Sequence, residues 1–326
     1  MSNAGAYGAD SDVIDYILGI TFEIWEEGGV DLIPQYYSDD CLIYGMDGIV
    51  RGSKVVVDGT RAMLDAFPDR LLLAEDVITA GSKADGLYSS HRILSPMTNL
   101  GATRFGPVTG RKIQLRNIAD CFVEDGVITK EWLMRDNLAF VSQLGYDPIG
   151  CAQQLASEFT DETKQWFATE IDRLSRDSLV SSDATLEGDP ENDPDGFARS
   201  VIAASWLGDD THFQRLYSPY SVWHRSPVQL YSGRKNSWQA YQRWHAALSQ
   251  RHASVDHVAC RRRDDGTVQI AARWTLTGHH RSALHGIEAT GKPVFVLGST
   301  HWHCVAGRVA VESTVFDELA VISQIL

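Results

Sequence analysis

Apolar residues near the start of the chain recur with the spacing of an amphipathic helix. The stripe consists of Ile14, Ile17, Leu18, Phe22 and Trp25. The glycines at 28–29 end this helix, and the pattern over residues 31–37 predicts a second short helix or a turn. An extended stretch follows at 41–45. A third helix is predicted over residues 53–67, because Pro68 cannot continue it.

From residue 70 onward the pattern becomes that of β-strands. Four runs rich in Val, Ile, Thr and aromatic residues lie at 71–80, 86–95, 111–123 and 127–134. Asp136 is then placed to cap a last helix, which stops at a glycine nine residues later. Helices therefore come first and an antiparallel sheet second, which predicts an α+β fold.

The second half of the chain repeats the first at an offset of 181 residues. Both halves end on the pattern D-x-L-A-x-x-S-Q, which starts at Asp136 and at Asp317. Trp25, Tyr36, Gly52 and Arg92 correspond in the same way to Trp206, Tyr217, Gly233 and Arg273. The offset needs no gap. We therefore predict two copies of one domain, over residues 10–150 and 196–326.

Residues 151–195 separate the two copies. Charged, helix-favouring residues between Ser157 and Asp177 predict a connecting helix, with Trp166 spaced to pack against a neighbour. Between Asp183 and Asp195 the chain holds six carboxylates and two prolines. Such a composition cannot bury a core, so this part is predicted to be an acidic surface loop or disordered linker.

Composition narrows the classes of partner. The 326 residues carry a formal charge of -14, which argues against binding to nucleic acid or to an anionic membrane. No apolar run approaches the ~18 residues that a membrane span needs. Five cysteines, an odd number without a CxxC pair, predict reduced thiols. With no signal peptide visible, we expect a cytoplasmic protein.

The hairpin before the last helix decides which side chains share a sheet face. A two-residue turn would place Glu131 opposite Asp120, which are like charges. A three-residue loop ending at Gly126 places Lys130 opposite Asp120 instead, and we predict this loop. One face then carries Asn117, Ala119, Cys121, Thr129, Glu131 and Leu133. Its counterpart in the second copy carries Gly298, Thr300, Trp302, Glu312 and Thr314.

Several motifs together resemble a known family. They are P-V-T-G at 107–110, Gly126, Trp132, Asp136 and Q-L-G at 143–145, and in the second copy Trp274, Gly278, His280 and T-G-K at 290–292. In these the chain resembles the SnoaL-like polyketide cyclases, or predicted ester cyclases, of the NTF2-like superfamily, as two tandem modules. The resemblance implies cones in which N-terminal helices pack on a curved antiparallel sheet around an apolar pocket.

The resemblance also implies an intramolecular aldol closure that uses an aspartate as acid and base, without a metal or other cofactor. At that aspartate's position this chain has Leu133 and Thr314, which cannot transfer a proton. The family's histidine, two residues earlier, is replaced by Glu131 and Glu312. The family's polar pair on the neighbouring strand corresponds to Asn117 and Ala119, and to Gly298 and Thr300.

Glu131 and Glu312 are the candidate catalytic residues. A carboxylate in an apolar pocket has a raised pKa and can take a proton next to a carbonyl, although each could instead pair with a nearby arginine. The candidate substrate-binding residues are Asn117, Arg92, Arg273, His280, Thr300 and Thr314. The two arginines could bind a ligand oxygen or simply form salt bridges. Asp136 and Asp317 are assigned to helix capping rather than to catalysis.

His301 and His303 share the opposite strand face, where two imidazoles could in principle hold a metal. Spacing supplies no third ligand, so no metal site is predicted. His280 is either a donor at the pocket mouth or an exposed loop residue.

Two classes of function fit the sequence. The first is a cyclase, isomerase or related proton-transfer enzyme that acts on a small apolar carbonyl compound. The second is a non-catalytic ligand-binding or assembly module that has lost the cyclase aspartate. A third hypothesis is that only one module is functional and that the other serves as a scaffold. A deep cavity with a carboxylate facing a donor would favour the enzyme, whereas a pocket plugged by Trp302 or Leu133 would favour the binding or structural role.

Modules of this family usually pair through the outer face of the sheet. We therefore expect an intrachain pseudo-dimer of the two modules, joined by the helix near Trp166. The sequence leaves open whether two chains pair further as a homodimer.

Overall fold

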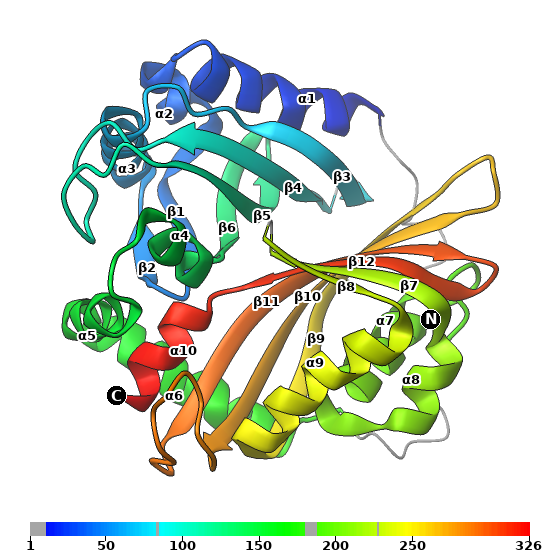
Figure 1. Ribbon diagram of the computed structural model, residues 1–326. Helices are drawn as coiled ribbons and strands as arrows, with labels where there is room; N and C mark the ends of the chain where they lie inside the picture. The colour runs from blue at the N-terminus through cyan, green and yellow to red at the C-terminus, as the bar shows by residue number, and fades with distance from the viewer. Residues whose placement is uncertain (1–10, 83–84, 180–187, 227) are drawn as a thin grey trace.

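The computed structural model describes residues 11–82, 85–179, 188–226 and 228–326, and shows two α+β modules side by side (Figure 1). Helices of the first module are α1 (Ser11–Thr21), α2 (Ile33–Tyr36), α3 (Ser53–Ala66) and α4 (Asn137–Leu144). Its strands are β1 (Tyr37–Gly45), β2 (Gly48–Arg51), β3 (Leu73–Ser82), β4 (Gly86–Thr98), β5 (Lys112–Glu124) and β6 (Val127–Arg135). A π-helical turn (Phe22–Glu26) extends α1, and a 3₁₀ turn (Val30–Leu32) precedes α2.

The second module repeats this order. Its helices are α7 (Pro194–Ile202), α8 (Asp210–Leu216), α9 (Arg234–Ala247) and α10 (Glu318–Ile325), with a π-helical turn (Ala203–Gly208) after α7. Its strands are β7 (Tyr217–Ser226), β8 (Gln229–Ser232), β9 (Leu248–Arg262), β10 (Val268–His280), β11 (Pro293–Val305) and β12 (Arg308–Phe316). The predicted order of helices and strands is thus confirmed in both halves.

Each sheet has six strands, in the orders β2-β1-β6-β5-β4-β3 and β8-β7-β12-β11-β10-β9. The expectation of a purely antiparallel sheet is wrong at one place in each module, because β1 pairs with β6, and β7 with β12, in parallel. The first strand of each module pairs on one side with the short strand that follows it, β2 or β8, and on the other side with the last strand, which comes only after helix α3 or α9 and three further strands. A pattern of local hairpins cannot reveal such a distant pairing.

The hairpin β5–β6 corrects the predicted three-residue loop. Its tip is a two-residue turn in which Asp125 and Gly126 both have positive φ angles, 50° and 82°, as a type I′ turn requires. A register shift between Phe122 and Val123 then adds one residue to β6, so that Glu131 lies opposite Cys121 and Asp120 opposite Trp132. This bulge avoids the pairing of like charges. It also leaves Glu131 on the predicted face of the sheet.

Strand pairing also corrects the uniform offset of 181. Tyr37 pairs with Ile128 at the start of β1, and Tyr217 pairs with Val309 at the start of β7. Ile128 and Val309 are 181 apart, whereas the two tyrosines are 180 apart. The structural equivalent of Tyr217 is therefore Tyr37 and not Tyr36. The second module loses one residue before β7 and regains it toward the end of β7, where the register with β8 shifts between His224 and Ser226.

Two helices connect the modules instead of one. The predicted connecting helix is α6 (Asp161–Arg176), and it is preceded by α5 (Pro148–Glu158), so that the predicted domain boundary at residue 150 falls inside a helix. Phe167 and Leu174 of α6 pack with Phe295 and Leu297 of β11 in one apolar cluster. Much of the predicted acidic loop lies outside the described residues. α6 thus covers part of the outer face of the second sheet.

The outer faces of the two sheets contact each other. The ring of Tyr88 in β4 stacks on His257 in β9, with ring centroids 3.5 Å apart. His301 Nε2 lies 2.8 Å from Ser90 Oγ, and the guanidinium carbon of Arg273 lies 3.5 Å from the ring centroid of Trp132. These contacts lie on the surface through which pairing was expected.

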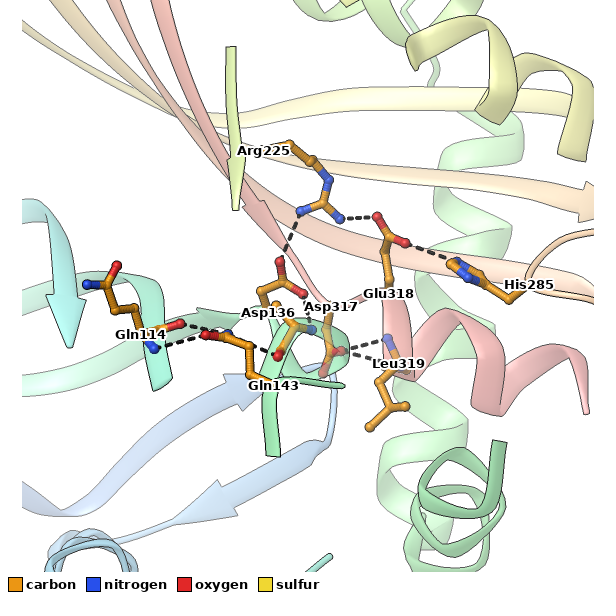
Figure 2. Close-up of polar contacts among 10 residues, drawn as sticks. Gln114, Asp136, Gln143, Arg225, His285, Asp317, Glu318 and Leu319 are labelled. Atoms are coloured by element: carbon orange, nitrogen blue, oxygen red, sulfur yellow. Dashed lines mark hydrogen bonds and ion pairs between the residues drawn. The ribbon is translucent and has the colours of Figure 1, made fainter. Parts of the chain in front are cut away.

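Asp136 and Asp317 cap the last helix of each module, as predicted (Figure 2). Asp136 Oδ1 accepts a hydrogen bond from the Ala139 N–H at 3.0 Å, and Asp317 Oδ1 accepts from Leu319 N–H at 2.9 Å. Each cap also reaches the other module. Asn137 donates to Asp317 Oδ2 at 2.5 Å, and Arg225 lies 3.6 Å from Asp136 Oδ2.

The glutamine of the repeated motif ties this last helix to its sheet. Gln143 Nε2 donates to Gln114 O at 2.9 Å while its Oε1 accepts from Gln114 N–H at 3.0 Å (Figure 2). Gln324 repeats both bonds with Phe295, at 2.9 and 2.8 Å. An amide is needed here because it supplies one donor and one acceptor to an unpaired backbone unit. The recurrence of this residue is therefore structural.

The buried cap at Asp317 makes stability depend on pH. Burial and the nearby Asp47 raise its pKa to about 7, so the proton is held more tightly in the folded than in the unfolded protein. The stabilisation is complete below the unfolded pKa of 3.8 and is lost as the pH rises toward 7. Asp317→Asn keeps the cap without the charge. It should raise the free energy of unfolding at pH 8 by roughly 1–3 kcal/mol, measured by urea unfolding.

At pH 4.5 the same substitution should have little effect. Asp147→Asn, at the exposed cap of α5, is the matched control and should leave the pH dependence as it is in the parent. An equal stabilisation by Asp317→Asn at both pH values would contradict the raised pKa.

Candidate functional site

The first module contains a cavity of about 480 Å³. It lies between the inner face of the sheet and helices α1 and α3. Glu131 and Leu133 of β6 and Asn117, Ala119 and Cys121 of β5 all line it. The bulge in β6 is what brings the two sets of residues to one face, because the side chains of a strand alternate between its faces.

Glu131 is the carboxylate of this cavity. Its side chain is only 5% exposed, and burial raises its pKa above the ordinary value of 4.5. A hydrogen bond from the Tyr37 hydroxyl and the charge of Arg135 act in the opposite direction. A carboxyl group whose pKa moves toward neutrality can both accept and return a proton. The proximity of Tyr37 adds a hydroxyl that holds the carboxylate in place.

Two further polar groups of the cavity have no partner in the described part of the chain. They are Nε2 of His91 in β4 and Oδ1 of Asn117 in β5, and both side chains are buried. Burial lowers the pKa of His91 to about 4, so its imidazole is neutral at physiological pH. Buried polar atoms are normally hydrogen-bonded. These two are therefore available to a ligand in the same cavity as Glu131.

The second module has no equivalent opening around Glu312. This carboxylate is 1% exposed and accepts hydrogen bonds from Tyr217 at 2.5 Å, Tyr241 at 2.6 Å and Thr314 at 2.6 Å. Glu312 does not line the cavity of about 480 Å³, nor two further cavities of about 410 and 330 Å³. With its oxygens occupied by these donors, Glu312 serves as the polar centre of a packed core. The structure does not bring it to a ligand site.

Aromatic side chains fill the space that is open in the first module. Six residues that line the first cavity have aromatic counterparts in the second: Ile43 corresponds to Trp223, Thr60 to Tyr241, Met63 to Trp244, Ile93 to Trp274, Cys121 to Trp302, and Arg135 to Phe316. Trp223, Trp274, Trp302, Tyr241 and Phe316 are among the largest fully buried side chains. The two modules share a backbone but differ in whether a ligand has room.

The remaining predicted binding residues lie outside the cavity. Arg92 is on the outer sheet face, where its Nε donates to Glu75 at 3.0 Å. Arg273 also faces the other module, over Trp132. His280 is buried and pairs with Thr290, with His280 Nδ1 3.1 Å from Thr290 Oγ1, and is not an exposed loop residue. Thr300 and Thr314 share a hydrogen bond of 3.0 Å inside the second core. Of the predicted binding set, only Asn117 lines the first cavity.

Tyr37 is the site residue that sequence reasoning missed. The assumed uniform offset matched Tyr217 with Tyr36, whose hydroxyl instead reaches Glu23 on the surface. The strand register shows that Tyr37 and Tyr217 each open the first strand of a module and each bond the glutamate of its last strand. The sequence shows two adjacent tyrosines, Tyr36 and Tyr37, either of which could match Tyr217. Only the strand register, with its one-residue shift between the modules, shows that Tyr37 is the match.

The described residues hold no cluster of three or more His, Cys, Asp or Glu side chains with the arrangement of a metal site. His301 of the histidine pair is instead used between the modules, beside Ser90. All five cysteines are free and buried. Within the described part of the chain no helix is long and apolar enough to cross a bilayer.

Comparison with known proteins agrees with this architecture. The family model described as SnoaL-like polyketide cyclase matches residues 17–144 and 199–325, which together make up about three quarters of the chain. No curated protein matches the chain.

Solved structures resemble one module at a time. TsrD from Streptomyces laurentii is 21% identical, with 40% of this chain and 91% of that chain covered and a TM-score of 0.34. A SnoaL-like polyketide cyclase from Agrobacterium tumefaciens is 20% identical, with 40% and 96% covered and a TM-score of 0.34. Because the family model matches both modules, the chain belongs to the SnoaL-like polyketide cyclase family, with one family domain in each half.

Proposed function

We propose that the first module is a proton-transfer enzyme acting on a carbonyl compound bound in its cavity, with Glu131 as the acid and base. The main support is the position of Glu131, a buried carboxyl group that lines the cavity and accepts a hydrogen bond from Tyr37. His91 and Asn117 line the same cavity with polar atoms that have no partner among the described residues. The family aspartate position is Leu133, which lines the same cavity with an apolar side chain. Glu131, opposite Cys121 on the strand pair, takes over the proton transfer.

The chemistry follows from the residues that surround the ligand space. Glu131 removes a proton from the carbon next to the ligand carbonyl, and the enolate oxygen that forms needs a hydrogen-bond donor. Asn117 can supply one through its amide, and the neutral His91 through a ring N–H. The proton then returns from Glu131 to carbon or oxygen. Cyclisation and isomerisation both begin with the removal of a proton next to a carbonyl, so they are the reaction classes that we propose.

The second module serves in this proposal as a scaffold. Its centre is filled by Trp302 and Trp223, and Glu312 is held by donors from its own core. Its outer sheet face packs against the outer face of the first sheet, opposite the cavity. A filled core gives that face a rigid support. The hypothesis of a non-catalytic module thus fits the second module, whereas the hypothesis of a proton-transfer enzyme fits the first.

Hydrogen–deuterium exchange next to a ketone tests this function without knowledge of the natural substrate. We expect the protein to accelerate exchange of the C4 protons of 5-oxo-5-phenylpentanoate or its methyl ester in D₂O, as followed by NMR. Cys121→Trp, which introduces the residue found at the equivalent position of the second module, should fill the cavity and abolish the acceleration. Circular dichroism would verify the fold. Acceleration that survives in a folded Cys121→Trp variant would place the chemistry elsewhere.

A further inference from the structure

Two arginines, Arg70 and Arg135, line the cavity that holds Glu131. Arg70 precedes strand β3, and Arg135 is the last residue of β6. Nε of Arg70 is buried and has no hydrogen-bond partner in the described part of the chain, and neither guanidinium forms an ion pair there. Guanidinium groups are rarely buried without a partner. The cavity therefore presents two cationic groups whose donors are unused.

These two cations also lie near each other. The pKa of Arg70 is lowered to about 10, first by burial and then by the positive charge of Arg135, while Glu26 opposes the shift. Glu26 itself is exposed and uses Oε1 to accept from the Leu72 N–H at 2.5 Å. Glu131 is the other acidic neighbour, and the two guanidinium groups outnumber its single carboxylate. The local charge of this part of the cavity is therefore positive.

The second module, whose core is filled by side chains, uses the same positions differently. Arg251, equivalent to Arg70, donates to four backbone carbonyls, those of Trp206, His245, Leu248 and Leu207, at 2.8–3.0 Å. The equivalent of Arg135 is Phe316. In the filled module, then, backbone carbonyls accept the hydrogen bonds of Arg251, and a phenylalanine replaces the second arginine. The open module keeps both arginines; among the described residues neither has an ion-pair partner, and Nε of Arg70 has no hydrogen-bond partner.

We infer that Arg70 and Arg135 bind an anionic oxygen group of the ligand, so that the substrate class is a carbonyl compound bearing a carboxylate. The inference rests on the proposed function in taking this cavity as the ligand site, and it replaces the neutral apolar molecule that the sequence suggested. A carboxylate accepts several N–H bonds and fits a guanidinium in a bidentate manner. The ligand carboxylate would accept hydrogen bonds from Arg70, as backbone carbonyls accept them from Arg251 in the second module.

The strand geometry limits the length of such a molecule. Glu131 and Arg135 lie four residues apart on β6 and point to the same face, so their Cα atoms are about 13 Å apart. The long arginine side chain shortens that gap enough for its charge to act on Glu131. A carboxylate and a ketone separated by a few carbons can therefore contact both groups. In 5-oxo-5-phenylpentanoate three methylenes separate them.

The test compares binding of this acid with binding of its methyl ester, which has the same shape without the charge. By isothermal titration calorimetry, the acid should bind the parent protein about ten- to a hundredfold more tightly than the ester. Arg70→Met and Arg135→Met keep the apolar stem of the side chain. Each should reduce the preference for the acid by about tenfold or more while leaving the affinity for the ester nearly unchanged.

Arg104→Met is the matched control. Arg104 lies at the exposed end of the same cavity but is already paired with Asp47 and Glu158, so the preference for the acid should persist. Equal affinity of the parent protein for acid and ester, or binding of neither, would overturn the inference whether or not the variants fold. Preference for the acid without any proton exchange would refute the proposed proton transfer and leave the anion site standing.

Discussion

Glu131→Gln is expected to reduce the rate of proton exchange at a bound ketone by about 100-fold or more, the range over which a positioned general base contributes. Glutamine has the same shape and still accepts the hydrogen bond from Tyr37, but its amide cannot take up a proton. Binding of 5-oxo-5-phenylpentanoate should change little, so the loss should appear in kcat rather than in KM. The measurement is exchange of the C4 protons by NMR under saturating conditions.

The pH profile distinguishes a catalytic role of Glu131 from a structural one. Because burial raises its pKa above 4.5, the parent protein should lose activity as the pH falls through that raised value, where the carboxylate takes up a proton. The variant should lack this limb.

Glu312→Gln is the matched control for Glu131→Gln. It places the same change at the equivalent position of the filled module, away from the first cavity, and should retain exchange. Equal losses in the two variants would reject Glu131 as the base.

Trp302→Ala is expected to lower the free energy of unfolding by about 3–5 kcal/mol. The Trp302 side chain is 1% exposed and belongs to the aromatic cluster that fills the second module. Removing it takes away a large apolar surface and leaves a void that the packed neighbours cannot close. Urea unfolding followed by circular dichroism would measure the change.

Cys121→Ala is the matched control for Trp302→Ala, because it truncates the equivalent residue of the first module. Cys121 is the equivalent residue of the first module, but it lies at the wall of a cavity that already exists, so its truncation should cost about 1 kcal/mol or less. Similar costs at the two positions would show that the second module is not packed as the structure indicates.

The elements and caps could be predicted because they depend on local patterns. Helical spacing located α1, Pro68 marked the end of α3, and runs rich in Val, Ile, Thr and aromatic residues located the strands. The repeated aspartates cap α4 and α10 as expected, since an N-cap bonds only the next turn of its own helix. The sheet face of Glu131 was also predicted correctly, although for a wrong reason. A two-residue turn followed by a bulge leaves it on the same face as the predicted three-residue loop.

The candidate site was only partly predictable, because its members come from distant strands. Glu131 and Asn117 were found from their shared hairpin. Tyr37 was missed because the parallel pairing of β1 with β6 joins the two ends of the module. Arg70 and Arg135 had no sequence signal at all. Their importance is apparent only from the structure, where both line one cavity and neither is paired with a carboxylate of the described residues.

By itself the sequence determined that this protein is a duplicated α+β chain of one family, with a carboxylate at equivalent positions of both copies. Those properties are carried by patterns that repeat along the chain. Only the tertiary structure decided which carboxylate faces an empty space. Whether a cavity exists depends on the summed volume of side chains from several strands and helices. Six aromatic residues in the second module occupy the positions whose counterparts line the cavity of the first.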